Sequence, residues 1–233
     1  MTASLARHEF PSPDALAEAL AQRVARELAT AIAARGRASL AVSGGKTPVR
    51  FFKALSKQAL DWANVAVTLV DERLVPDTDE RSNARLVAQN LLQGAAADAR
   101  FVPLYSPAQT PELATHNAAN ALTVSGVPMP LDVAVLGMGG DGHTASFFPD
   151  AENLGALFAN AAGAKVLPVT AKSAGEPRLT MSAQLLGAAR FVALHIEGQE
   201  KRAVLEEALS GGTKPIATMI AMASTPVEVF WAP

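Results

Sequence analysis

The sequence predicts an α/β domain built on a mostly parallel sheet that is covered by helices. Short apolar runs alternate along the chain with alanine-rich stretches of helical periodicity, and this order of elements gives a parallel sheet. The apolar runs are rich in β-branched residues, as is typical of strands that are buried on both faces. The chain has 233 residues, of which 49% are hydrophobic, so it can bury the core of a single domain spanning residues 1–233.

Each element is predicted from one such run or stretch. The apolar runs that predict strands are Ser39–Ser43, Val65–Val70, Phe101–Leu104, Asp132–Gly137, Lys165–Thr170, Arg190–Ile196 and Val227–Trp231. The stretches that predict helices are Asp14–Arg35, Val49–Leu60, Asn83–Leu92, Glu112–Val124, Thr180–Ala188 and Gln199–Leu209. Ser12 and Ser82 are expected to cap the first turn of two helices, and Gly36 is expected to end one.

Charge and composition exclude several classes of protein. The formal net charge is −2, and no run of basic residues is longer than a pair, so a nucleic-acid partner is not expected. Cysteine is absent, which excludes disulfides and a cysteine nucleophile. The first residues, Met1–Leu20, are too charged for a signal peptide, and no apolar run approaches the ~20 residues of a membrane span. We therefore expect a cytoplasmic protein.

A glycine-rich turn follows the first predicted strand. It consists of Ser43, Gly44, Gly45, Lys46 and Thr47, and Pro48 comes after it. Glycines leave backbone N–H groups accessible, so a turn of this kind before a helix suits a phosphate or several sugar hydroxyls. An ordinary tight turn with Pro48 at the first helical position explains the same residues equally well. The turn is not a Walker A loop, because Leu40 stands where that motif needs glycine.

Charged residues end the second predicted strand. They are Asp71, Glu72 and Arg73, and Asn83 follows after a polar loop. Ligands of open α/β sheets collect beyond the carboxyl ends of the strands, which favours a binding role for these side chains. Arg73 offers planar, fixed donors that suit an oxyanion or a carbonyl oxygen. A solvated strand end is the alternative interpretation.

The fourth predicted strand runs into a glycine-rich segment, 137–149, that carries an acid and an imidazole. Asp141 and His143 lie two residues apart in this segment, after Gly139. Their position directly after a buried strand is typical of an active-site loop. The glycines also match a dinucleotide fingerprint, but Pro149 interrupts the long helix that this motif requires. A dinucleotide cofactor is therefore not expected.

Two further basic residues are candidates for phosphate binding. Arg178 lies at a predicted helix start and Lys201 follows the sixth predicted strand. Taken alone, each is more typical of a solvated charge at a helix end. The remaining histidines, His8, His116 and His195, have no motif around them and are expected to be structural or exposed. No pair of histidines has metal-ligand spacing, and G-x-S-x-G is absent, so neither a metal site nor a serine hydrolase is predicted.

Taken together, these motifs resemble the 6-phosphogluconolactonase family in order and spacing, from about Phe10 to Trp231. The segments that carry the resemblance are Ser43–Pro48, Asp71–Arg73 with Ser82–Asn83, Gly137–Pro149, Pro177–Thr180 and Gly198–Lys201. The resemblance implies an open Rossmann-like, mostly parallel sheet with helices on both faces. It also implies the cytosolic second step of the oxidative pentose phosphate pathway, in which 6-phospho-D-glucono-1,5-lactone is opened to 6-phosphogluconate without a metal or another cofactor.

The resemblance also implies roles for the candidate residues. His143 would be the general base toward water, an apt role because imidazole exchanges protons near neutral pH, with Asp141 or a backbone carbonyl orienting its ring. Arg73 would stabilise the oxyanion. Lys201 and Arg178 would hold the 6-phosphate together with backbone N–H groups of the turn at residues 43–47. The remaining residues expected to bind substrate are Asp71, Asn83 and Gly139.

Two alternatives use the same scaffold. A glucosamine-6-phosphate deaminase or a related isomerase would carry a glutamate where this chain has Phe148, and it would lack an arginine at the position of Arg73. A sugar-phosphate sensor without catalysis would normally be fused to a DNA-binding module, for which the single helix predicted before Ser39 leaves no room. Both Arg73 and His143 favour the lactonase.

Overall fold

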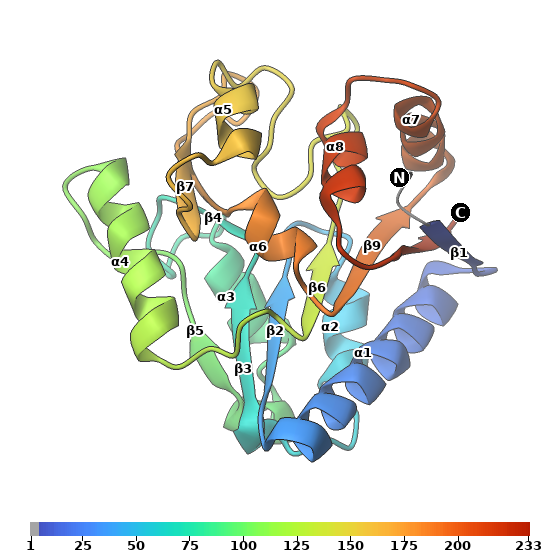
Figure 1. Ribbon diagram of the computed structural model, residues 1–233. Helices are drawn as coiled ribbons and strands as arrows, with labels where there is room; N and C mark the ends of the chain where they lie inside the picture. The colour runs from blue at the N-terminus through green and yellow to red at the C-terminus, as the bar shows by residue number, and fades with distance from the viewer. Residues whose placement is uncertain (1–4) are drawn as a thin grey trace.

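A seven-stranded parallel sheet forms the centre of the computed structural model, which describes residues 5–233 (Figure 1). The predicted domain begins at Met1, and its first four residues lie outside the described part. The strand order is β1-β10-β9-β6-β2-β3-β5, and every neighbouring pair is parallel. The strands are β1 (Leu5–Glu9), β2 (Ala38–Val42), β3 (Val65–Leu69), β5 (Arg100–Val102), β6 (Val133–Leu136), β9 (Phe191–Glu197) and β10 (Val227–Ala232). The predicted α/β class is confirmed.

A second, antiparallel sheet continues from the carboxyl end of β3. Its order is β4-β8-β7, with β4 at Asp71–Arg73, β7 at Val166–Val169 and β8 at Arg178–Met181. Figure 1 shows this second sheet beyond the upper ends of β2 and β3. It therefore lies next to the carboxyl ends of the central strands, where a ligand is expected to bind.

One predicted helix is wrong in its first half. The sequence predicts a helix from Thr180, with Arg178 at its start, whereas residues 178–181 form β8. This segment pairs with β4 on one side and β7 on the other, so tertiary pairing overrides its local helical pattern. The helix begins only at Ala183, after Ser182 caps it by accepting from the Leu185 backbone N–H at 3.2 Å.

Helices cover both faces of the central sheet. They are α1 (Pro13–Arg35), α2 (Val49–Leu55), α3 (Asn83–Asn90), α4 (Pro111–Val124), α5 (Leu154–Ala159), α6 (Ala183–Gly187), α7 (Gln199–Leu209) and α8 (Pro215–Met222). Among them α1 contacts α2, and α6 contacts α8. Since crossovers between parallel strands are normally right-handed, the reversal in strand order after β5 puts these two pairs on opposite faces. Besides β8, the structure adds β1, β4, α5 and α8 to the predicted elements, and it ends α2 at Leu55 rather than Leu60. No helix within residues 5–233 has both the length and the apolar character needed to cross a membrane.

The predicted helix ends are confirmed where capping residues are present. Ser12 accepts a hydrogen bond from the Ala15 backbone N–H at 3.2 Å, and Ser82 accepts one from Arg85 at the same distance. Gly36 ends α1 in the left-handed region at φ 73°, which glycine adopts without strain.

The central strands place a crevice at their carboxyl ends. All residues of β2, β3 and β6 are buried, as expected for strands covered on both faces. From β2 the chain moves to β3 on one side, while β6 pairs with β2 on the other side. This reversal of direction is the topological switch point at which open α/β sheets bind ligands.

Candidate active site

A cavity of about 320 Å³ opens at the carboxyl ends of β2 and β6. Its walls contain all but one of the predicted site residues, namely Ser43, Gly44, Gly45, Lys46, Thr47, Asp71, Arg73, Asn83, Gly139, His143, Arg178 and Lys201. The exception is Asp141, which does not line the cavity but forms a hydrogen bond with His143, which does. Segments that are far apart in the sequence therefore meet at one site.

His143 and Asp141 form a hydrogen-bonded pair on the loop after β6. The carboxylate oxygen Oδ1 of Asp141 lies 2.6 Å from Nδ1 of His143 and also accepts the His143 backbone N–H at 3.0 Å. The group that orients the ring is thus the carboxylate rather than a backbone carbonyl. With Nδ1 engaged, Nε2 is the ring nitrogen that can accept a proton. The imidazole packs against the Phe148 ring, with 4.5 Å between centroids.

Close packing of the loop requires glycine at position 139. A Cβ on Gly139 would lie 2.2 Å from Cε1 of His143 and 2.8 Å from Oδ1 of Asp141. The loop is closed by a hydrogen bond from the Gly139 N–H to the His143 carbonyl at 2.9 Å and by Thr144, whose hydroxyl donates to the Gly137 carbonyl at 2.8 Å. The imidazole is therefore held by a compact turn rather than by a free loop.

The glycine-rich turn after β2 is tied to the same loop. Ser43 Oγ donates to the Val135 carbonyl at 3.1 Å and accepts the Gly137 N–H at 2.9 Å, so this hydroxyl joins the ends of β2 and β6. A Cβ on Gly44 would lie 1.8 Å from Oδ1 of Asn83, and Gly45 has a φ of 93°. The two glycines thus allow Asn83 to approach and the chain to turn.

Of the three charged residues after β3, one is structural. Glu72 is fully buried, and its carboxylate accepts the backbone N–H groups of Arg73, Asn83 and Ala84 at 2.7 to 2.8 Å. Desolvation raises the pKa of Glu72, while these hydrogen bonds oppose the shift. The carboxylate therefore pins the start of α3 to β4. The sequence alone did not distinguish this structural role of Glu72 from the binding role expected of Asp71 and Arg73.

Asp71, a neighbour of Glu72, and Asn83, a hydrogen-bond partner of Glu72, line the cavity. Asp71 accepts the Ser146 hydroxyl at its Oδ2, at 2.6 Å, and its main-chain carbonyl accepts the Asn83 amide at 2.9 Å. Both side chains are buried, so their remaining polar atoms are fixed in direction. Ser146 is a contributor that sequence reasoning missed.

Arg73 and Arg178 lie opposite each other in the β4–β8 register. Both line the cavity, and the Arg178 guanidinium carbon lies 5.6 Å from the centre of the Phe148 ring. Desolvation lowers the pKa of Arg178, and the nearby Arg73 charge lowers it further. Within the described part of the chain, the buried Nε of each arginine has no hydrogen-bond partner. Two adjacent cations with unsatisfied donors are suited to binding an anion.

Lys201 brings a further cation to the cavity from the first turn of α7. Its ammonium group lies 3.4 Å from the Thr47 hydroxyl, next to the glycine-rich turn. Burial lowers the pKa of Lys201, which the charges of Glu197 and Glu200 partly offset. An anion bound here would stabilise the buried ammonium charge and so offset part of the cost of removing it from water.

His195 is on the cavity wall, although sequence reasoning assigned it no role. It is buried on β9, and its Nε2 lies 3.3 Å from a Glu197 carboxylate oxygen. Its position is explained by the strand order, which places β9 next to β6. Among residues 5–233 no group of three or more His, Asp or Glu side chains is arranged to hold a metal ion.

Comparisons with known proteins agree with this architecture. The family described as "Glucosamine-6-phosphate isomerases/6-phosphogluconolactonase" matches residues 11–231. A 6-phosphogluconolactonase of Mesorhizobium japonicum is 56% identical, with 96% of this chain and 94% of that protein covered. The corresponding protein of Rhizobium meliloti is 52% identical, with 97% and 98% covered. The crystal structure of a 6-phosphogluconolactonase from Shewanella baltica has a TM-score of 0.94 and 38% identity over 100% of both chains. The chain therefore belongs to the glucosamine-6-phosphate isomerase/6-phosphogluconolactonase family.

Proposed function

We propose that this protein hydrolyses 6-phospho-D-glucono-1,5-lactone to 6-phosphogluconate, the activity in the names of its relatives. The observation that carries the proposal is the His143–Asp141 pair, which lies on a cavity that also holds Arg73, Arg178 and Lys201. A base next to several cations suits the attack of water on a lactone that also carries a phosphate.

The chemical step requires a base, His143, and a donor to the oxyanion, Arg73. Nε2 of His143 takes a proton from a water molecule as its oxygen bonds to C1 of the lactone. Asp141 holds the Nδ1–H and stabilises the imidazolium that forms. Arg73 donates to the carbonyl oxygen, which becomes an oxyanion. When the tetrahedral intermediate collapses, the bond from C1 to the ring oxygen breaks, and the imidazolium returns its proton to that oxygen. The ring opens to the acid.

The phosphate is held away from this centre. Arg178 and Lys201 form charge-assisted hydrogen bonds to it, together with backbone N–H groups of the turn at residues 43–47. The free Oδ1 of Asp71 accepts a sugar hydroxyl, and Asn83 fixes the backbone of Asp71. Gly139 contributes by leaving room for the imidazole.

A deaminase reaction is the second candidate on this scaffold. Isomerisation with loss of ammonia requires proton transfer between adjacent carbons and hence several acid–base groups around the ring. Phe148 lies against the His143 ring at the position where that branch carries a glutamate, and a phenyl ring cannot relay a proton. This contact favours the lactonase.

The test compares both reactions in one preparation. Purified protein is assayed for 6-phosphogluconolactone hydrolysis, corrected for spontaneous opening, and for ammonia release from glucosamine 6-phosphate. We expect enzyme-dependent hydrolysis and no ammonia. Ammonia release at a comparable rate, with hydrolysis no faster than the spontaneous reaction, would establish the deaminase instead. Binding of the sugar phosphate with neither reaction would establish a sensor.

We also expect the enzyme to act in the cytoplasm, because the oxidative pentose phosphate pathway that its family resemblance implies is cytosolic. Fractionation of cells with an antibody against the protein tests this expectation. Recovery with the membrane fraction would contradict it.

A further inference from the structure

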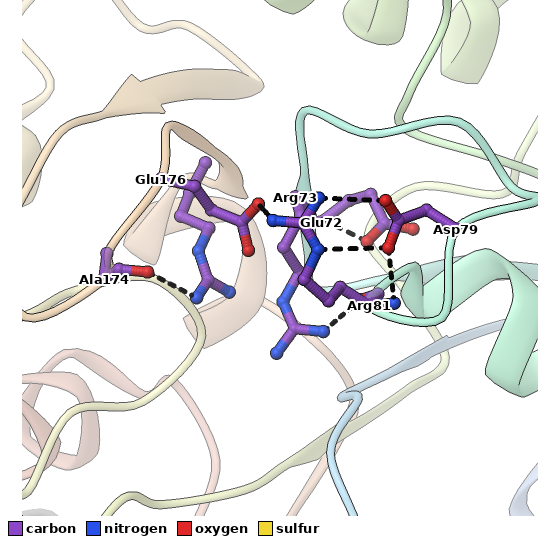
Figure 2. Close-up of polar contacts among 7 residues, drawn as sticks. Glu72, Arg73, Asp79, Arg81, Ala174 and Glu176 are labelled. Carbon is purple, nitrogen blue, oxygen red and sulfur yellow. Dashed lines mark hydrogen bonds and ion pairs between the residues drawn. The ribbon is translucent and has the colours of Figure 1, made fainter.

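Two loops hold the side chains of the cavity arginines. The loop at residues 74–82 follows Arg73, and the Arg73 guanidinium donates to the main-chain carbonyl of Arg81 within it. The loop at residues 170–177 precedes Arg178, whose Nη2 donates to the main-chain carbonyl of Ala174 at 3.1 Å (Figure 2). The direction of each guanidinium therefore depends on where its loop lies.

The side chain of Arg81 joins these two loops. Its Nε and Nη2 donate to the two carboxylate oxygens of Asp79 at 3.0 and 2.9 Å, and its Nη1 donates to Glu176 at 2.5 Å. The Arg81 backbone N–H also donates to Asp79 at 2.9 Å. Figure 2 shows Arg81 between the two acids. We call Asp79, Arg81 and Glu176 the Arg81 clamp.

The clamp is more than a single surface ion pair. An isolated exposed pair contributes little, whereas a bidentate fork with a third acceptor restricts the geometry of all three side chains. The hydrogen bonds from Arg81 lower the pKa of Asp79 to about 2, so this acid is ionised at any working pH. The Asp79 and Glu176 side chains are 28% and 17% exposed and the Arg81 side chain is 56% exposed, so the link lies at the surface and its strength comes from its geometry.

The two arginines need such a support because they repel each other. Like charges at directly opposite positions of an antiparallel pair are destabilising. Burial lowers the pKa of Arg178, and the proximity of Arg73 lowers it further. Each guanidinium has one backbone carbonyl as an anchor, and the clamp fixes the two carbonyls relative to each other.

We propose that Arg81 is a positioning residue, which keeps Arg73 and Arg178 directed into the cavity at the spacing that a phosphorylated sugar acid requires. Of the described residues, those that line the cavity do not include the clamp, so Arg81 acts through the two arginines. The inference rests on the proposed function for the identity of the anion.

Arg81→Ala tests the side chain alone, because the carbonyl that anchors Arg73 belongs to the main chain. We expect the Kd for 6-phosphogluconate, measured by calorimetry, and the KM for the lactone to rise by about 3- to 10-fold, the range of a small interaction network. The melting temperature should stay within about 2 °C, since exposed substitutions change stability little. Arg81→Lys should restore part of the affinity, because lysine keeps the charge but not the fork.

A double-mutant cycle and a control make the test specific. Glu176→Gln should weaken binding in the same direction, and combining it with Arg81→Ala should add little, because both changes break one link. The control is Arg7→Ala, which removes another exposed, bidentate pair, with Glu206 at 2.6 and 3.1 Å, outside the cavity. Its Kd and KM should equal those of the wild type.

Each outcome separates this inference from the lactonase proposal. Wild-type Kd and KM in Arg81→Ala would overturn the positioning role, as would an equal loss in Arg7→Ala. If the wild type binds 6-phosphogluconate without hydrolysing the lactone, the proposed function fails while the binding measurements still decide the role of Arg81. If the wild type does not bind 6-phosphogluconate, the inference fails as well.

Discussion

Asp141 and His143 are only two residues apart, yet the carboxylate reaches Nδ1 of the imidazole because the chain turns tightly between them. The Gly142 φ of 84° allows that turn. The acid also holds the His143 backbone N–H, so ring and backbone are fixed by one group. A base positioned in this way needs no reorientation before it accepts a proton.

His143→Ala should lower kcat by about 10²- to 10⁴-fold, the usual contribution of a positioned general base, and change KM only a few-fold. Asp141→Asn should lower kcat less, because the base remains but its ring is oriented less well. Steady-state assays on the phosphorylated lactone measure both. Wild-type turnover of His143→Ala would remove this residue from the mechanism.

The burial of Lys201 predicts that the affinity for a phosphorylated ligand falls at alkaline pH. Burial lowers the pKa of Lys201 in the free protein, and a bound phosphate dianion raises it again by favouring the charged form. Binding should therefore take up a proton, and affinity should fall as Lys201 loses its charge. Calorimetry with 6-phosphogluconate between about pH 8 and 10 measures how the Kd changes with pH. This interval lies below the usual pKa range of lysine. Lys201→Arg should remove the dependence, and an unchanged profile in that variant would assign it to another group.

Single residues differed in how far the sequence predicted them. Asp141 and His143 were predicted because an acid and an imidazole follow a buried strand. The buried role of Glu72 depends on three N–H groups, two of which come from a helix start eleven or twelve positions away. His195 reaches the cavity only because β9 pairs with β6. Neither the hydrogen bonds of Glu72 nor the pairing of β9 with β6 is marked by a pattern in the neighbouring sequence.

At the scale of elements, the central strands were predictable and the second sheet was not. Buried strands such as β2 and β6 carry a continuous apolar pattern, since helices cover both of their faces. β8 has only four residues, and its pairing with β4 and β7 decides its conformation. β7 was predicted as a strand, but its place in the antiparallel sheet depends on the same pairing.

The glycines at the ends of β2 and β6 give a prediction about these elements. Gly139→Ala would place a Cβ 2.2 Å from the His143 ring, and Gly44→Ala would place one 1.8 Å from Asn83. The ring or the loop must move in the first case, so kcat should fall by about 10-fold or more, as catalytic geometry tolerates little displacement. Asn83 must move in the second, which disturbs Asp71 and should raise KM.

Gly155→Ala is the matched control for these two variants. Gly155 lies in α5, and a Cβ there would meet no atom within 4 Å. This change should leave kcat and KM unaltered and should not lower stability, because alanine favours a helix. Equal losses of activity in all three variants would show that the effect is not specific to the site.

At the scale of the whole molecule, the cavity joins segments from β2 to α7. Arg73 and Arg178 come from the paired strands β4 and β8, whereas Lys46 follows β2 and Lys201 belongs to α7. Burying these side chains costs electrostatic free energy in the free protein, because burial lowers the pKa values of both Arg178 and Lys201. A bound dianion offsets this cost only in the folded state.

Product binding should therefore stabilise the whole fold. At a 6-phosphogluconate concentration 100 times its Kd, mass action adds roughly 2.7 kcal/mol to the free energy of unfolding. For a chain of this size, that corresponds to a rise in Tm of roughly 5 to 10 °C. Gluconate at the same concentration should raise Tm much less, because it lacks the phosphate that we propose Arg178 and Lys201 bind. Lys201→Ala should reduce the shift produced by 6-phosphogluconate toward that of gluconate. Equal shifts with the two acids would show that the phosphate does not bind at these cations.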